Sequence, residues 1–107
     1  MEKMRDDIRS AGAWFVCEYS SPILDNYQAL VHDKVFKTEF VKHVFREAKR
    51  DSHIGGTRTR VNAVLRIIDR HELADALIYV IHSDRVGFDE PDAIEKAKIL
   101  YMKISVH

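Results

Sequence analysis

The stretch Gly-Gly-Thr-Arg-Thr-Arg-Val-Asn-Ala-Val-Leu-Arg-Ile-Ile-Asp-Arg, residues 55–70, has two distinct sides when it is wound into a helix. Apolar residues recur along one side: Val61, Val64, Leu65 and Ile68. A polar stripe with a residue at every fourth position follows another side: Arg58, Asn62, Arg66 and Arg70. Because both spacings match the helical period, the stretch predicts an amphipathic α-helix over residues 57–70, with Thr57 as its N-cap.

The segment before this helix shows the same period. A helix is predicted here from the apolar stripe Phe36, Phe40, Val44 and Ala48, and residues 51–56 are expected to end it. After residue 70 a new stripe starts almost at once, so residues 69–71 are expected to form a tight corner. The next predicted helix has the apolar residues Leu73, Ala76, Leu77, Val80 and Ile81, and residues 86–89 are expected to close it.

Both ends of the chain are also predicted to be largely helical. Near the C-terminus, Asp89 or Glu90 with Pro91 opens a helix with the stripe Ile94, Ala97, Leu100, Tyr101 and Ile104, and residues 104–107 are expected to fray or extend. At the N-terminus, one helix is expected on the stripe Met4, Ile8, Ala11 and Phe15. The run from Trp14 to Cys17 is apolar on all sides, so a short buried strand remains an alternative there.

A stop and restart is expected at residues 20–22, because Ser21 can cap a helix and Pro22 suits its first position. The next stripe is Ile23, Tyr27, Leu30 and Val31. Together these patterns predict one all-α domain over residues 1–107, a compact array of five to six short helices. One short extended segment near Trp14 is possible in that array.

The composition excludes several classes of protein. Of the 107 residues, 46% are hydrophobic and one is cysteine, so a disordered chain and a disulfide scaffold within one chain are both disfavoured. No apolar run approaches the roughly 20 residues that span a bilayer. Residues 1–9 carry charges of both signs and do not resemble a signal peptide. We therefore expect a cytoplasmic protein that does not bind membranes.

The charge of the chain is zero overall but unevenly distributed. Residues 1–33 have 3 basic and 6 acidic side chains, residues 34–70 have 10 and 4, and residues 71–107 have 4 and 7. A basic middle segment between two acidic ends is typical either of a binding face or of complementary segments within one fold. The same distribution would allow copies of the chain to associate head to tail.

No motif for catalysis is evident. The six histidines include no pair at the three- or four-residue spacing that a helical metal site needs, and Glu-x-x-His does not occur. Cys17 lies in an apolar run, which favours an inert thiol. We expect no enzyme activity, no cofactor and no bound metal. A metal-dependent hydrolase built on His43 and Glu47 is a minor alternative to the solvent-exposed helix face that these residues predict.

The start of the helix over residues 57–70 has the chemistry best suited to binding a partner. Gly55 and Gly56 allow a sharp turn, and the exposed N–H groups of a helix start favour anions. The predicted contact residues are Gly55, Gly56, Thr57, Arg58, Arg60, Asn62, Arg66 and Arg70. Additional basic contacts are expected from Lys42, Arg46, Lys49 and Arg50.

Three functions use this basic centre, residues 42–70. The first is a non-enzymatic module that binds a protein partner or itself, since arginine is enriched at protein interfaces. The alternative is a helix-turn-helix-like regulator that reads nucleic acid through the helix over residues 57–70. The zero net charge and the six-residue turn before Thr57 disfavour that alternative. The third function is the binding of a small anionic ligand.

Overall fold

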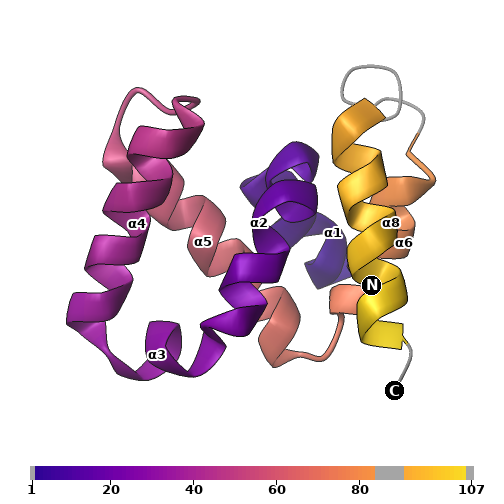
Figure 1. The fold of residues 1–107 in the computed structure, drawn as a ribbon, viewed down its shortest axis with the longest axis horizontal. Coiled ribbons are helices and arrows are strands. Elements are labelled where there is room, and N and C mark those ends of the chain that lie inside the picture. Colours follow the sequence, from indigo (N-terminus) through magenta and orange to yellow (C-terminus); the bar gives the residue numbers. More distant parts are fainter. Residues whose placement is uncertain (1, 84–90, 106–107) are drawn as a thin grey trace.

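The computed structural model describes residues 2–83 and 91–105, and every regular element in these two ranges is an α-helix (Figure 1). The helices are α1 (Glu2–Ala11), α2 (Ala13–Asp25), α3 (Tyr27–His32), α4 (Lys34–Ala48), α5 (Ile54–Asp69), α6 (Leu73–Ile81) and α8 (Pro91–Ser105). The predicted all-α class is confirmed. The described residues form seven helices rather than five or six, because two predicted helices are divided or extended at unexpected places.

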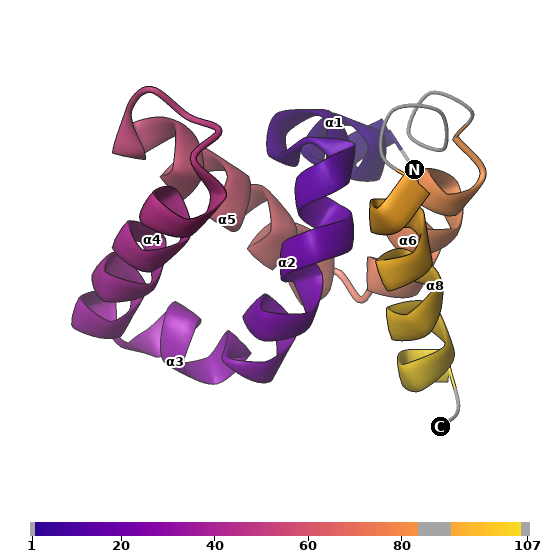
Figure 2. The same ribbon diagram turned by 45° about the horizontal axis from the view of Figure 1, so that its top comes forward.

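Helix α5 lies at the centre of the arrangement and contacts α1, α2, α4 and α6. The pair α3 and α4 lies on one side of it, and α6 with α8 lies on the other (Figure 2). The predicted residues Val61, Val64 and Leu65 are buried, and Ile68 is half-buried. Ala63 and Ile67 are buried as well. The buried part of α5 is therefore wider than the single stripe that the sequence predicts.

Gly12 divides the predicted N-terminal helix in two. Its φ of 88° lies in the left-handed region, which residues with a Cβ avoid. The amide of Gly12 still donates to the Ile8 carbonyl at 2.8 Å, and its own carbonyl accepts from the Val16 amide at 3.0 Å. The break therefore turns the chain while these backbone groups keep their partners. All four stripe residues are nevertheless buried: Met4, Ile8, Ala11 and Phe15.

The segment from Trp14 to Cys17 is helical, so the alternative of a strand is wrong. Helix α2 contacts α1, α3, α5, α6 and α8. A helix covered on several sides is apolar over most of its circumference, which is why this run lacks a one-sided pattern. Phe15, Val16 and Cys17 are all buried.

The predicted stop and restart at residues 20–22 is also wrong, because α2 continues through Pro22 to Asp25. A proline inside a helix removes one backbone hydrogen bond, and packing on several neighbours compensates for this loss. The helix ends instead at Asn26, whose backbone N–H and side-chain Nδ2 both donate to the Pro22 carbonyl, at 3.1 and 2.8 Å. The apolar residues predicted to follow Pro22 are thus divided between α2 and α3.

The predictions for the second half of the chain are mostly confirmed. Helix α4 starts after Asp33, whose side chain accepts a hydrogen bond from the Phe36 amide at 3.0 Å. Residues 70–72 form the corner between α5 and α6, with His71 at a φ of 60°. Pro91 is the first residue of α8, but the expected fraying from residue 104 is wrong for Ile104 and Ser105, which are still helical. The helix end expected at residues 86–89, and residues 106–107, lie outside the described residues.

The backbone at Gly12 leads to a stability prediction. A Cβ at this position would lie 2.7 Å from Arg60 Nη1 and 3.0 Å from Trp14 Nε1, in addition to the strain of its positive φ. We expect Gly12→Ala to lower the free energy of unfolding by about 2–3 kcal/mol. Urea denaturation followed by circular dichroism measures this change.

Gly55→Ala is the matched control, because a Cβ at Gly55 meets nothing within 4 Å and the residue lies in the first turn of α5. We expect this variant to be neutral or more stable by up to about 1 kcal/mol. Equal effects of the two substitutions would contradict the role assigned to Gly12.

Candidate interaction surface

Two arginines of the predicted polar stripe bind a carboxylate inside the molecule. Arg66 Nε donates to Asp7 Oδ1 at 2.9 Å, and Arg70 Nη2 donates to Asp7 Oδ2 at 2.7 Å. Asp7 is only 7% exposed, and it belongs to α1. Arg70 also donates through Nε to Glu72 at 2.7 Å. This part of the stripe therefore joins α5 to the acidic N-terminal segment.

The pKa of Asp7 reflects this contact. Burial alone would raise it, but the hydrogen bonds from Arg70 and Arg66 outweigh burial and hold the pKa below its ordinary value. The carboxylate thus stays charged in the folded protein. The position of Asp7 in the sequence contains a signal for this burial, since Asp7 lies three residues after Met4 and four before Ala11, on the edge of the apolar stripe.

The start of α5 is built around a second carboxylate, Asp51. Arg60 donates to both of its oxygens, with Nε–Oδ2 at 3.1 Å and Nη2–Oδ1 at 3.0 Å, and also to the Ala11 carbonyl. Thr57 is buried and its hydroxyl donates to Asp51 Oδ2 at 2.8 Å. The hydrogen bond from Arg60 is the main reason why the pKa of Asp51 lies below its ordinary value.

Two expectations for this segment are wrong. Helix α5 begins at Ile54, and its N-cap residue is His53 rather than Thr57. Gly55 and Gly56 lie inside its first turn, and neither has a positive φ. Thr57 does not cap the helix because its buried hydroxyl donates a hydrogen bond to Asp51. A Cβ on Gly56 would lie 3.2 Å from Asp51 Cγ, so this glycine allows the carboxylate to approach the helix.

Trp14 contacts two arginines near Asp51. The guanidinium carbon of Arg50 lies 4.3 Å from the centre of its ring, and that of Arg60 lies 5.2 Å from it. Contacts of this kind between a guanidinium and an indole are attractive. Arg50, predicted as a secondary basic contact, and Arg60, predicted as a primary one, are therefore both part of the packing around α2.

The remaining predicted residues differ in their surroundings. Asn62 is half-buried and accepts a hydrogen bond from Lys37 of α4. Gly55 and Gly56 are exposed, and so is Arg58, whose side chain has no hydrogen bond or ion pair within residues 2–83 and 91–105. All four secondary contacts, on the C-terminal half of α4 and just after it, are also exposed: Lys42, Arg46, Lys49 and Arg50.

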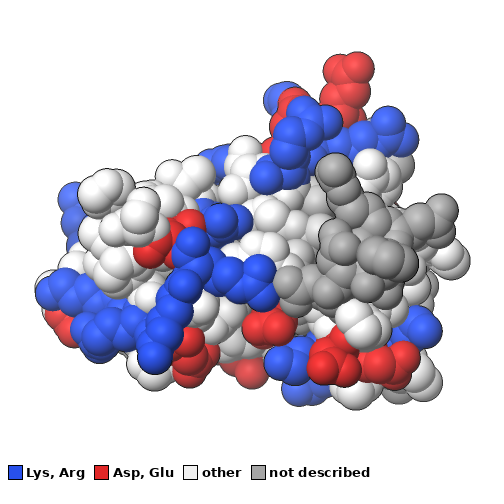
Figure 3. All heavy atoms as spheres, turned by 90° about the horizontal axis from the view of Figure 1, so that it is seen from above, with Lys and Arg blue, Asp and Glu red and all other residues white. Residues whose placement is uncertain are grey.

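We call Lys42, Arg46, Lys49 and Arg58 the basic end. Among the described residues, only Lys42 of this set has an ion pair, with Glu39 at 3.4 Å, and both of these side chains are largely exposed. Viewed from the side on which α4 ends and α5 begins, Lys and Arg side chains gather over this part of the surface (Figure 3). Arg50 and Arg66 are exposed as well, but Arg50 lies on the Trp14 ring and Arg66 pairs with Asp7.

His43 and Glu47, the residues of the metal-hydrolase alternative, lie on the surface of α4. His43 Nε2 is 3.3 Å from Glu47 Oε2, and Tyr19 of α2 donates its hydroxyl to Glu47 Oε1 at 2.7 Å. Within the described ranges, no three His, Cys, Asp or Glu side chains are grouped so that they could hold a metal ion. Glu47 thus links α2 to α4.

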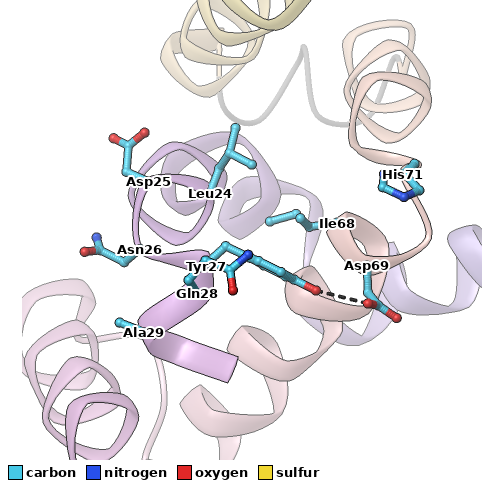
Figure 4. Close-up of a pocket in the computed structure, with 9 residues that line it drawn as sticks. All are labelled: Leu24, Asp25, Asn26, Tyr27, Gln28, Ala29, Ile68, Asp69 and His71. Carbon is cyan, nitrogen blue, oxygen red and sulfur yellow. Dashed lines mark hydrogen bonds between the residues drawn. The ribbon is translucent and has the colours of Figure 1, made fainter. Parts of the chain in front are cut away.

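A hollow of about 670 Å³ between α2, α3 and α5 was not predicted from the sequence (Figure 4). Its apolar wall includes Leu24 and Ile68, and on its rim Tyr27 donates a hydrogen bond to Asp69 Oδ1 at 3.0 Å. The hydroxyl and the carboxylate thus satisfy each other. Because these residues come from three helices, no short motif could have indicated the hollow.

No family model, curated protein or solved structure matches this chain. In the part of the chain that the structure describes, no helix is both long and apolar enough to cross a membrane.

The buried carboxylate gives a second stability prediction. We expect Asp7→Asn to lower the free energy of unfolding by about 2–3 kcal/mol, because Arg66 and Arg70 lose their charged acceptor. Asp6→Asn is the control, since the Asp6 side chain is 69% exposed and, among the described residues, pairs only with Arg9. That substitution should change stability by less than about 0.5 kcal/mol. Thermal and urea unfolding measure both variants, and a similar loss from each would contradict the network.

The lowered pKa values of Asp7 and Asp51 predict how stability depends on pH. A carboxylate with a pKa below its unfolded value of about 3.9 contributes stability above that pH, and the contribution is lost as the pH falls through the folded pKa. We expect the melting temperature to fall between about pH 5 and pH 2. The fall should be smaller in Asp7→Asn, where only Asp51 still contributes. Equal slopes in the two proteins would count against the assigned pKa of Asp7.

Proposed function

We propose that this chain is a non-enzymatic interaction module whose basic end binds an acidic surface of a partner protein. One observation carries the proposal. Of the basic residues predicted to form the contact face, those at the junction of α4 and α5 are exposed, whereas Arg60, Arg66 and Arg70 bind Asp51 and Asp7. Among the described residues, Arg46, Lys49 and Arg58 have no ion pair, and the pair of Lys42 with Glu39 is largely exposed, so this cationic surface is available to an external carboxylate.

The surroundings of the other polar groups support binding rather than catalysis. The two strongest clusters, around Asp7 and Asp51, consist of carboxylates whose oxygens accept hydrogen bonds from arginine. An acid with a lowered pKa and satisfied oxygens is a poor proton donor or acceptor near neutral pH. A cytoplasmic site of action remains a prediction from the sequence.

The position of α5 favours a protein partner over nucleic acid. A reading helix must lie in the major groove with one side open along its length. Helix α5 contacts four other helices, and of its predicted reading residues Arg66 and Arg70 bind Asp7 and Asn62 binds Lys37. Arg58 alone among these four has no such contact in the described residues.

Head-to-tail association of copies is less favoured for a similar reason. The acidic N-terminal segment was its expected partner surface, but the Asp7 of that segment already binds α5 of the same chain. The basic end would thus meet only the more weakly charged remainder of that segment. We therefore assign the basic end to a different protein.

The proposal is tested with a poly-glutamate peptide of about 20 residues as the probe, followed by fluorescence anisotropy. We expect binding at about 50 mM salt that weakens strongly at about 500 mM. Lys42→Glu combined with Arg46→Glu should weaken binding by roughly tenfold or more, because two attractive contacts become repulsive.

The matched control is Lys96→Glu combined with Lys98→Glu, which makes the same charge change on α8. This control should bind the peptide like the unmodified chain. Equal losses from both double variants, or no binding at low salt, would contradict the proposal. If a duplex DNA of about 20 base pairs binds more tightly than the peptide and loses affinity in the same variant, the nucleic-acid alternative replaces it.

A further inference from the structure

The hollow between α2, α3 and α5 carries negative charge that no described residue neutralises. Asp25 and Asp69 belong to its lining, which among the described residues contains no lysine or arginine. Within residues 2–83 and 91–105, neither carboxylate has an ion pair. The hydrogen bond from Tyr27 to Asp69 comes from a neutral hydroxyl, so it leaves the charge of this carboxylate in place. In this respect the hollow differs from Asp7 and Asp51, which bind arginines.

We propose that this hollow binds a small organic amine, with the ammonium group on Asp69 and the apolar body on Leu24 and Ile68. The site is separate from the basic end, and the inference goes beyond the proposed function. The volume of about 670 Å³ lies within the range of ligand pockets in proteins, about 300–1,000 Å³. The charge selects a cation, and the apolar wall selects an organic one.

The hydroxyl end of Tyr27 and the carboxylate of Asp69 form the polar part of the site. Tyr27 is the first residue of α3, and its side chain reaches toward α5, where the hydroxyl donates to Asp69 Oδ1 at 3.0 Å (Figure 4). Asp69 Oδ2 accepts no hydrogen bond from the described residues. An ammonium group has three N–H donors, so it can bind Oδ2 and the lone pairs of the Tyr27 oxygen together.

The groups around this point suit a singly charged ligand. Burial and the hydrogen bond to Asp69 raise the pKa of the Tyr27 hydroxyl above its ordinary value, so this group stays neutral. The carboxylate of Asp25 is directed away from the hollow, so it attracts a cation without touching it (Figure 4). In the two described ranges, no three His, Cys, Asp or Glu side chains are grouped to hold a metal ion. One carboxylate and one neutral hydroxyl are therefore the direct contacts.

The apolar part of the site extends beyond the first hollow. Leu24 and Ile68 are half-buried, and both also line a neighbouring hollow of about 260 Å³ that reaches Leu73 and Ile104. An apolar ring placed next to Asp69 would remove part of this surface from water. This contact distinguishes an amine with an apolar body from a bare ammonium ion.

The openness of the site sets a modest affinity. Asp69 and His71 are exposed, and water screens an ion pair in such surroundings. For a ligand of about nine non-hydrogen atoms we expect a dissociation constant on the order of 1 mM. Removal of the ligand's charge should weaken binding about threefold to tenfold.

A titration of the full chain with 2-phenylethylamine tests the site. Two-dimensional NMR of the backbone amides at about pH 8, where an alkyl amine is charged and His71 is neutral, measures the binding. Shifts should saturate at millimolar amine and include Ala29, Ile68 and His71. The uncharged analogue 2-phenylethanol should bind about threefold to tenfold more weakly. No saturation up to about 20 mM, shifts spread over the whole surface, or equal affinity for the alcohol would overturn the proposal.

Asp69→Asn tests the carboxylate and leaves an amide oxygen that can still accept from Tyr27. This variant should bind the amine only as weakly as the unmodified chain binds the alcohol, and circular dichroism verifies that it is folded. Asp6→Asn is the matched control, because it removes an exposed carboxylate of α1 that is not part of the hollow. The control should bind the amine like the unmodified chain. Equal affinities of the two variants would refute the role of Asp69.

A lysine side chain of a partner protein carries the same ammonium group, so the source of the amine needs its own comparison. N-acetyl-lysine methylamide should bind at least about threefold more weakly than 2-phenylethylamine, because its flexible chain has no apolar ring. Tighter binding of the lysine compound would assign the hollow to a peptide and overturn the proposal of a small amine. The variant Lys42→Glu/Arg46→Glu should bind 2-phenylethylamine normally, so this result is independent of binding at the basic end.

Discussion

The packing of α5 against four neighbouring helices is the constraint on which the rest of the structure depends. A helix in this position must provide acceptors for the half-buried guanidinium groups of Arg60 and Arg70, because a charge partly removed from water is costly unless it is paired. Asp7 from α1 and Asp51 from the turn before α5 supply these acceptors. The break at Gly12 belongs to the same arrangement, since a side chain there would collide with Arg60.

This internal pairing changes the meaning of the charge distribution. The basic middle segment resembles a binding face when it is counted along the chain, but much of its charge neutralises acids of the same molecule. The accessible remainder is small and lies at one end of α4 and α5. Among the described residues, only Lys42 of the basic end has an ion pair, so function is better sought there than along the whole arginine stripe.

Much of the fold could be predicted because helical periodicity is a local property. The stripes of α4, α5, α6 and α8 correspond to helices in the structure, and Pro91 starts α8 as expected. The errors occurred where surroundings override local preference. Pro22 continues a helix because packing compensates for its missing N–H, and the segment after Trp14 is helical because neighbours cover it on several sides. The candidate site was harder to predict, because the partners of Arg66 and Arg70 are about 60 positions away in the sequence.

The sequence by itself determined that the chain is helical, many of the residues that form its core, and that its positive charge is concentrated in the middle. These properties follow from spacing and composition, which act over a few residues. Only the tertiary structure decided which arginines remain accessible, that Thr57 is buried against Asp51 rather than capping a helix, and that Tyr27 and Asp69 meet at one hollow. The reason is that solvent exposure and ion pairing depend on which distant segments meet, and no local pattern encodes that meeting.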